Sequence, residues 1–160
     1  MNKDTKNVLN LLESYRKRER EIALLRFELE NHARVMSEEL IEAMNFARQD
    51  GAGRSLGHVS DKTPYIALNY QEQAERMNRT VSDEIAVRLV ELEREQGRLV
   101  YYISLLEPRQ QQALKRIYMD RAPRETVAQE VGLSVRRLQE VKSQAIDALA
   151  EMYDFTAGLY

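Results

Sequence analysis

The first fifty residues contain neither glycine nor proline, the two residue types that fit a helix worst. The whole chain of 160 residues has six glycines and three prolines, and four of these nine lie between positions 51 and 64. The sequence therefore predicts an all-α fold that opens with one uninterrupted long helix over residues 1–50. A flexible linker region over residues 51–80 is expected to follow. The sequence does not decide whether residues 65–80 of this linker form a short helix.

Apolar residues recur at helical spacing within this first block. The repeat consists of Tyr15, Ile22, Leu29 and Met36, with Leu11 and Leu25 between them. Arg18 and His32 interrupt the stripe, but a seven-residue repeat is still typical of helices packed side by side. The run RKRERE at 16–21 alternates in sign, and we interpret it as a solvated helix face rather than a nucleic-acid patch.

A second heptad-bearing helix is predicted over residues 81–106, with Ser82 as its N-cap. Its seam steps by four and three through Ile85, Leu89, Leu92, Gln96, Leu99, Ile103 and Leu106. Gln96 is the single polar member, and we interpret it as packing against the first helix or against a partner chain. The helix should end near Glu107, because Pro108 disfavours helical geometry in the residue before it. The two long helices together predict a long helical hairpin or coiled-coil-like arm for packing or oligomerisation.

The last third of the chain carries the clearest local pattern. A short helix is predicted over 124–131, and a final helix from Val135 to about Met152. Between them, Gly132 suits the left-handed end of one helix and Ser134 suits the cap of the next. Ala128, four residues before the glycine, is small enough to let two helices cross closely. This pattern predicts a helix-turn-helix domain, and a plain helical hairpin with solvated charges is the alternative.

In a helix-turn-helix protein the second helix presents its first outward side chains to the major groove. With Arg124 on the preceding helix, the side chains that we expect to contact DNA are Ser134, Val135, Arg136, Arg137, Gln139, Glu140, Lys142 and Ser143. Arginine can pair with guanine edges, glutamine with adenine, and glutamate can accept from cytosine. Lys142, and Arg137 if it turns aside, would suit phosphates. The DNA-binding domain is expected to span residues 107–153.

A wider set of residues matches one family. These residues are Leu106, Arg109, Leu114 and Tyr118, then Glu125, Val127, Ala128, Val131, Gly132, Leu133 and Ser134, and finally Leu138, Val141, Ala145, Ile146 and Leu149. On them, residues 105–150 resemble region 4 of sigma-70-type factors, a helix-turn-helix that reads promoter DNA. The resemblance assigns base contacts to Val135, Arg136, Gln139 and Glu140. Val135 stands where the family usually has arginine, and Gln139-Glu140 replaces arginine-glutamine, so the family's standard promoter element is not carried over.

The layout of the whole chain also resembles small phage-encoded regulators of the RinA/ArpU type, which activate late or packaging genes. They too combine a long N-terminal helix, a gap, a second long helix and a sigma-region-4-like domain. This resemblance implies a phage or prophage origin. The chain lacks room for a sigma region 2, so we do not expect a complete sigma factor.

The leading hypothesis is a sequence-specific transcription regulator that binds double-stranded DNA as a homodimer, paired through helices within 5–50 and 80–106. The alternatives are a small terminase-like subunit for phage DNA packaging and a helical protein that binds RNA polymerase. The net charge of −2 argues against a chain coated in positive charge. Residues 107–150, however, hold eight basic and six acidic side chains, a net of +2.

Other classes of protein are disfavoured by composition. There is no cysteine, which excludes a disulfide scaffold and a cysteine-ligated zinc site. The two histidines, His32 and His58, are far apart, and no catalytic constellation surrounds them, so we expect no metal site, no cofactor and no enzyme. No stretch approaches about 18 consecutive apolar residues, and the N-terminus lacks the core of a signal peptide. We expect a cytoplasmic protein without a membrane partner.

Overall fold

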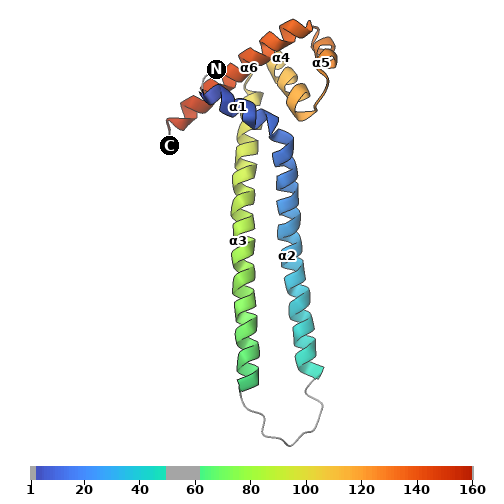
Figure 1. The fold of residues 1–160 in the computed structure, drawn as a ribbon, viewed down its shortest axis with the longest axis vertical. Coiled ribbons are helices and arrows are strands. Elements are labelled where there is room, and N and C mark those ends of the chain that lie inside the picture. The colour runs from blue at the N-terminus through green and yellow to red at the C-terminus, as the bar shows by residue number, and fades with distance from the viewer. Residues whose placement is uncertain (1–2, 50–61, 160) are drawn as a thin grey trace, which may run out of the picture. The chain divides into compact units, whose positions relative to one another are not determined.

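The computed structural model describes residues 3–49 and 62–159 (Figure 1). Its elements are α1 (Lys3–Glu13), α2 (Tyr15–Gln49), α3 (Lys62–Ser104), α4 (Pro108–Leu114), the π-helical turn η2 (Lys115–Met119), α5 (Arg124–Val131) and α6 (Val135–Ala157). No β-strand occurs within the described ranges, and the prediction of an all-α fold is confirmed.

The chain divides into two compact units. The bundle unit comprises residues 1–22 and 92–160, and the hairpin unit comprises residues 23–91. The hairpin unit holds most of α2 and the first part of α3, which run in opposite directions (Figure 1). All the elements from α4 onwards belong to the bundle unit, together with α1 and the adjoining ends of α2 and α3.

A single large apolar cluster holds most of the bundle unit together. It gathers side chains from α1, the end of α3, α4, η2 and α6. Its largest fully buried members are Val8, Leu12, Leu99, Ile103, Leu114 and Leu149. Because α1 packs along α6, the N-terminal residues are part of the C-terminal domain's core. The sequence analysis did not predict that residues of the first helix pack against the last one.

The prediction of one uninterrupted helix over residues 1–50 is wrong at Ser14, which separates α1 from α2. The serine hydroxyl donates to the carbonyl of Asn10 at 2.6 Å. Residues on both sides of the break bind η2 and the loop after it: the Arg16 side chain donates to the carbonyl of Met119, and the Arg121 side chain donates to the backbone carbonyl of Glu13, each at 2.7 Å. The backbone N–H of Ser14 still donates to Asn10 and that of Arg18 to Ser14, so the irregularity is confined to one residue, whose hydroxyl makes the kind of local bond that bends helices.

The heptad seam of the second long helix is confirmed by burial. Its buried members are Leu89, Leu92, Leu99, Ile103 and Leu106. Gln96, the polar position, contacts the first block of the same chain: its amide oxygen accepts from Arg18 at 3.0 Å, and its amide nitrogen donates to the carbonyl of Tyr15 at 3.4 Å. Arg18 is itself only 6% exposed. Arg18, which interrupts the apolar stripe of the first block, therefore contacts Gln96, the polar position in the seam of α3.

The start of the second long helix differs from the prediction. α3 begins at Lys62, so Ser82 lies inside a helix and is no N-cap, and residues 62–80 are helical rather than part of a linker. Neither glycine nor proline occurs between positions 65 and 96, so a helix once nucleated can propagate through this segment. Pro64 lies in the first turn, where a proline is tolerated. The rest of the predicted linker, residues 51–61, lies outside the described residues.

Candidate nucleic-acid interface

The interface candidate is built from α5, a three-residue turn and the first turns of α6. The observed bounds of α5 match the prediction of 124–131, and α6 begins at Val135 as expected but extends to Ala157. Gly132 ends α5 with φ 71° and ψ 37°, in the left-handed region. Ser134 caps α6 by accepting a hydrogen bond from the backbone N–H of Arg137 at 3.2 Å. These local signals in the sequence were sufficient to place the turn.

A small apolar cluster fixes α5 against α6. It comprises Ala113 of α4, Val127 and Ala128 of α5, and Leu138 of α6, each at most 3% exposed. Ala128 lies in this cluster, as expected from the need for a small side chain where two helices approach. The cluster leaves the opposite side of α6 to solvent.

The exposed side of α6 carries several of the predicted side chains. Arg136, Gln139, Glu140 and Ser143 are three, four and seven residues apart, so they lie on one face of the helix. The Arg136 side chain is 93% exposed and that of Glu140 is 43% exposed. Within the predicted set, these four form one outward surface, which we call the α6 face.

Two arginines hold the carboxylate of Glu140. Its Oε2 lies 2.6 Å from Nη1 of Arg137, and its Oε1 lies 3.8 Å from Nε of Arg136. The pairs span three and four positions, the spacing at which helix side chains meet. Glu140 therefore neutralises part of the positive charge near the start of α6, and its hydrogen bond orients Arg137.

Of the remaining predicted residues, Arg137 contacts the α6 face through Glu140, and the others differ in position. Val135 is 46% exposed at the first position of α6, and Arg124 is exposed at the first position of α5. Lys142 is half-buried; burial lowers the pKa of its ammonium, the charge of Arg124 lowers it further, and Glu13 acts in the opposite direction. Lys142 is thus turned towards the bundle rather than lying on the outward α6 face.

A salt-bridge network that the sequence analysis did not single out secures α5. Arg116 of η2 binds Glu130 with two hydrogen bonds of 2.6 and 2.7 Å, and it binds Asp120 at 2.9 Å. Hydrogen bonding to Glu130 and then to Asp120 raises the pKa of Arg116, and the hydrogen bond from Arg116 lowers the pKa of Glu130. Arg116 and Glu130 lie on separate elements, η2 and α5, so periodicity within one helix could not reveal their pairing.

In the part of the chain that the structure describes, no group of three or more His, Cys, Asp or Glu side chains is placed to hold a metal ion. Among the same residues, no helix combines the length and apolarity needed to span a membrane. Comparison of the chain with protein-family models, with curated proteins and with solved structures finds no match.

Two glycine substitutions are expected to shift stability in opposite directions. A Cβ at Gly132 or at Gly97 would meet no atom within 4 Å, so neither site is sterically blocked. Gly132→Ala forces a side chain into the left-handed region and should lower the free energy of unfolding by about 1 kcal/mol. Gly97→Ala, inside α3, should raise it by about 1 kcal/mol. Urea denaturation measures both, and a free energy of unfolding that does not fall on Gly132→Ala would contradict the role of Gly132 as the turn residue.

Proposed function

We propose that this chain is a sequence-specific transcription regulator that binds double-stranded DNA with the α6 face in the major groove. The observation that carries the proposal is the exposed set Arg136, Gln139, Glu140 and Ser143 on the first turns of a helix that follows a tight turn. This is the geometry by which a recognition helix presents base-reading side chains. The resemblance to sigma-70 region 4 supports the same reading helix, and the RinA/ArpU-type layout supports a phage or prophage regulator in the cytoplasm.

The modest charge of the interface shapes the expected binding. Glu140 accepts a hydrogen bond from Arg137 and forms a longer ion pair with Arg136, so at least one ion pair must rearrange when Arg136 or Arg137 contacts a base or a phosphate. Specific recognition then depends on side chains of the α6 face that form better hydrogen bonds with the bases of the correct DNA site than with those of a wrong site. Binding by one copy should be weak and strongly dependent on salt, because phosphate contacts release counterions.

Association into a homodimer is part of the proposal. The hairpin unit exposes large apolar side chains: Leu24, Phe27, Val87 and Val90 are each at least 60% exposed. Exposed apolar surface favours association of copies. Light scattering tests this: a dimer supports a regulator that reads two half-sites, whereas a ring of many subunits favours a small terminase-like packaging component.

The test of DNA reading starts with selection of binding sites from random duplexes, followed by titration of the selected site. Arg136→Ala should weaken specific binding by about 1–3 kcal/mol, roughly 5- to 150-fold, and relax the preference at one base pair. Arg94→Ala removes the same charge from an exposed position of α3 and is the matched control. Equal losses in the two variants would contradict base reading by α6. Absence of any DNA binding at low salt would favour a helical protein that binds RNA polymerase instead.

A further inference from the structure

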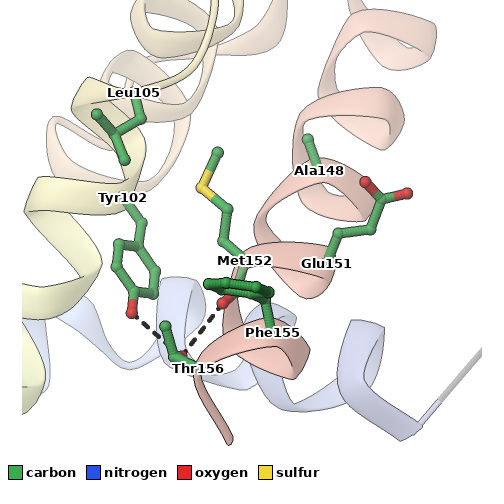
Figure 2. Close-up of a pocket in the computed structure, with 7 residues that line it drawn as sticks. All are labelled: Tyr102, Leu105, Ala148, Glu151, Met152, Phe155 and Thr156. Atoms are coloured by element: carbon green, nitrogen blue, oxygen red, sulfur yellow. Dashed lines mark hydrogen bonds between the residues drawn. The ribbon is translucent and has the colours of Figure 1, made fainter. Parts of the chain in front are cut away.

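A groove lies in the bundle unit between the end of α3 and the C-terminal half of α6, further along the helix that carries the α6 face. Its volume is about 370 Å³. Tyr102 of α3 and Leu105, which follows the last residue of α3, form one wall, and Ala148, Met152 and Phe155 of α6 form the other (Figure 2). Its lining is almost wholly apolar. The groove was not predicted, because its walls are brought together only by the fold.

Contacts between α3 and α6 fix the two walls of the groove relative to each other. The hydroxyl of Tyr102 donates to Oγ1 of Thr156 at 3.2 Å, and Thr156 in turn donates to the carbonyl of Met152 at 3.2 Å (Figure 2). The ring of Tyr102 packs edge-on against Tyr153, with centroids 4.9 Å apart. These contacts join the two walls, so the depression is preformed rather than a gap between loose helices.

The rim of the groove is apolar and exposed. Phe155 is 74% exposed and Leu105 is 55% exposed, although both line the groove. Tyr101, next to one wall, is 62% exposed, and Leu159, one turn after Phe155, is 66% exposed. Exposed large apolar side chains at and near an apolar groove are typical of a site for a protein partner.

An acidic edge runs beside the groove and indicates the charge of the partner. Asp147, Glu151 and Asp154 are exposed at positions four and seven apart on α6, and Glu151 also lines the groove. None of the three forms an ion pair with another described residue. A second copy that docked α6 against α6 would bring these like charges together, which disfavours that occupant.

We infer that the groove binds an amphipathic helix of another protein whose apolar stripe is flanked by lysine or arginine. The apolar side chains enter between α3 and α6 in the way that a third helix packs into the groove of two others. The basic side chains lie against Asp147, Glu151 and Asp154. The surface is separate from the α6 face, so this inference does not rest on DNA binding.

The test uses two fluorescent synthetic helices of 18 residues, titrated with the full chain and followed by anisotropy. One carries leucine at helical spacing with lysine flanks, and the other has glutamate in place of every lysine. The lysine peptide should bind, and the glutamate peptide should bind at least tenfold more weakly. No binding of the lysine peptide, or equal binding of the two, would overturn the proposal.

Variants of the chain locate the site. Ala148→Leu fills the groove, and Glu151→Lys reverses the charge of its rim; each should weaken binding of the lysine peptide by about five- to tenfold. Glu84→Lys makes the same charge change at an exposed position in the hairpin unit and should leave binding unchanged. Equal effects of Glu84→Lys and Glu151→Lys would show non-specific attraction and refute the site. A drop in the mass of the chain itself on Ala148→Leu or Glu151→Lys would identify a second copy as the occupant and overturn the inference.

Discussion

Arg18→Met is expected to lower the free energy of unfolding by about 2–4 kcal/mol. The guanidinium donates to the side-chain oxygen of Gln96 at 3.0 Å, to the hydroxyl of Ser14 at 2.8 Å and to the carbonyl of Leu11 at 2.6 Å. Methionine fills a similar volume but leaves these partly buried acceptors without their donor, and each such loss costs about 1–3 kcal/mol before relaxation. Urea denaturation of the full chain measures the change.

A double-mutant cycle with Gln96→Leu separates the hydrogen bonds from packing. Gln96→Leu alone should cost about 1–3 kcal/mol, because a nearly buried arginine loses an acceptor. The double variant makes both seams apolar at this point, so its loss should be smaller than the sum of the two single losses by about 1–2 kcal/mol. Strictly additive losses would show that the two side chains act independently, contrary to the geometry.

The sequence identified Arg18 and Gln96 as polar positions, but it did not predict that they contact each other. Arg18 and Gln96 each stand out as a polar position in an otherwise apolar seam, so periodicity was enough to find them. They are 78 positions apart, and only the relative register of the two helices brings them together. Periodicity within one helix carries no information on that register, which is why a partner chain remained an alternative for Gln96.

The interpretation of the run at 16–21 as a solvated face is wrong for Arg18, which is buried. Arg16 is exposed, although its side chain donates to the carbonyl of Met119. Arg18 lies at a seam position, between Tyr15 and Ile22, so the seven-residue repeat already marked it as inward. Its heptad position, and not the alternating charge of the run, determines the burial of Arg18. Lys17 and Glu21 do fit the solvated face, since they form an exposed pair at 3.7 Å.

The turn before α6 was predictable because its causes are local. Gly132 and Ser134 act through their own backbone and side chain, and the Arg136–Glu140 pair follows from helical spacing. The environment of Lys142 was not predictable. It depends on Arg124 and Glu13, which come from α5 and from the end of α1.

Leu138→Ala is expected to lower the free energy of unfolding by about 3 kcal/mol, within the range of 2–5 kcal/mol for a buried leucine. Leu138 is 1% exposed and belongs to the small cluster that contains Val127 and Ala128 of α5. The cavity should loosen α5 first, because the large cluster among the described residues includes no residue of that helix. Amide hydrogen exchange should therefore show faster exchange in α5 than in α1.

Leu149→Ala is the matched control, because Leu149 is a fully buried leucine on the same helix but belongs to the large cluster that includes α1. A similar loss of stability is expected, with the increase in exchange displaced from α5 to α1. If both variants loosen α5 equally, the small cluster is not what positions it. If the proposed reading by α6 holds, Leu138→Ala should also weaken specific DNA binding more than Leu149→Ala under conditions where both stay folded. The reason is that only the first removes the packing that sets α5 against the recognition helix.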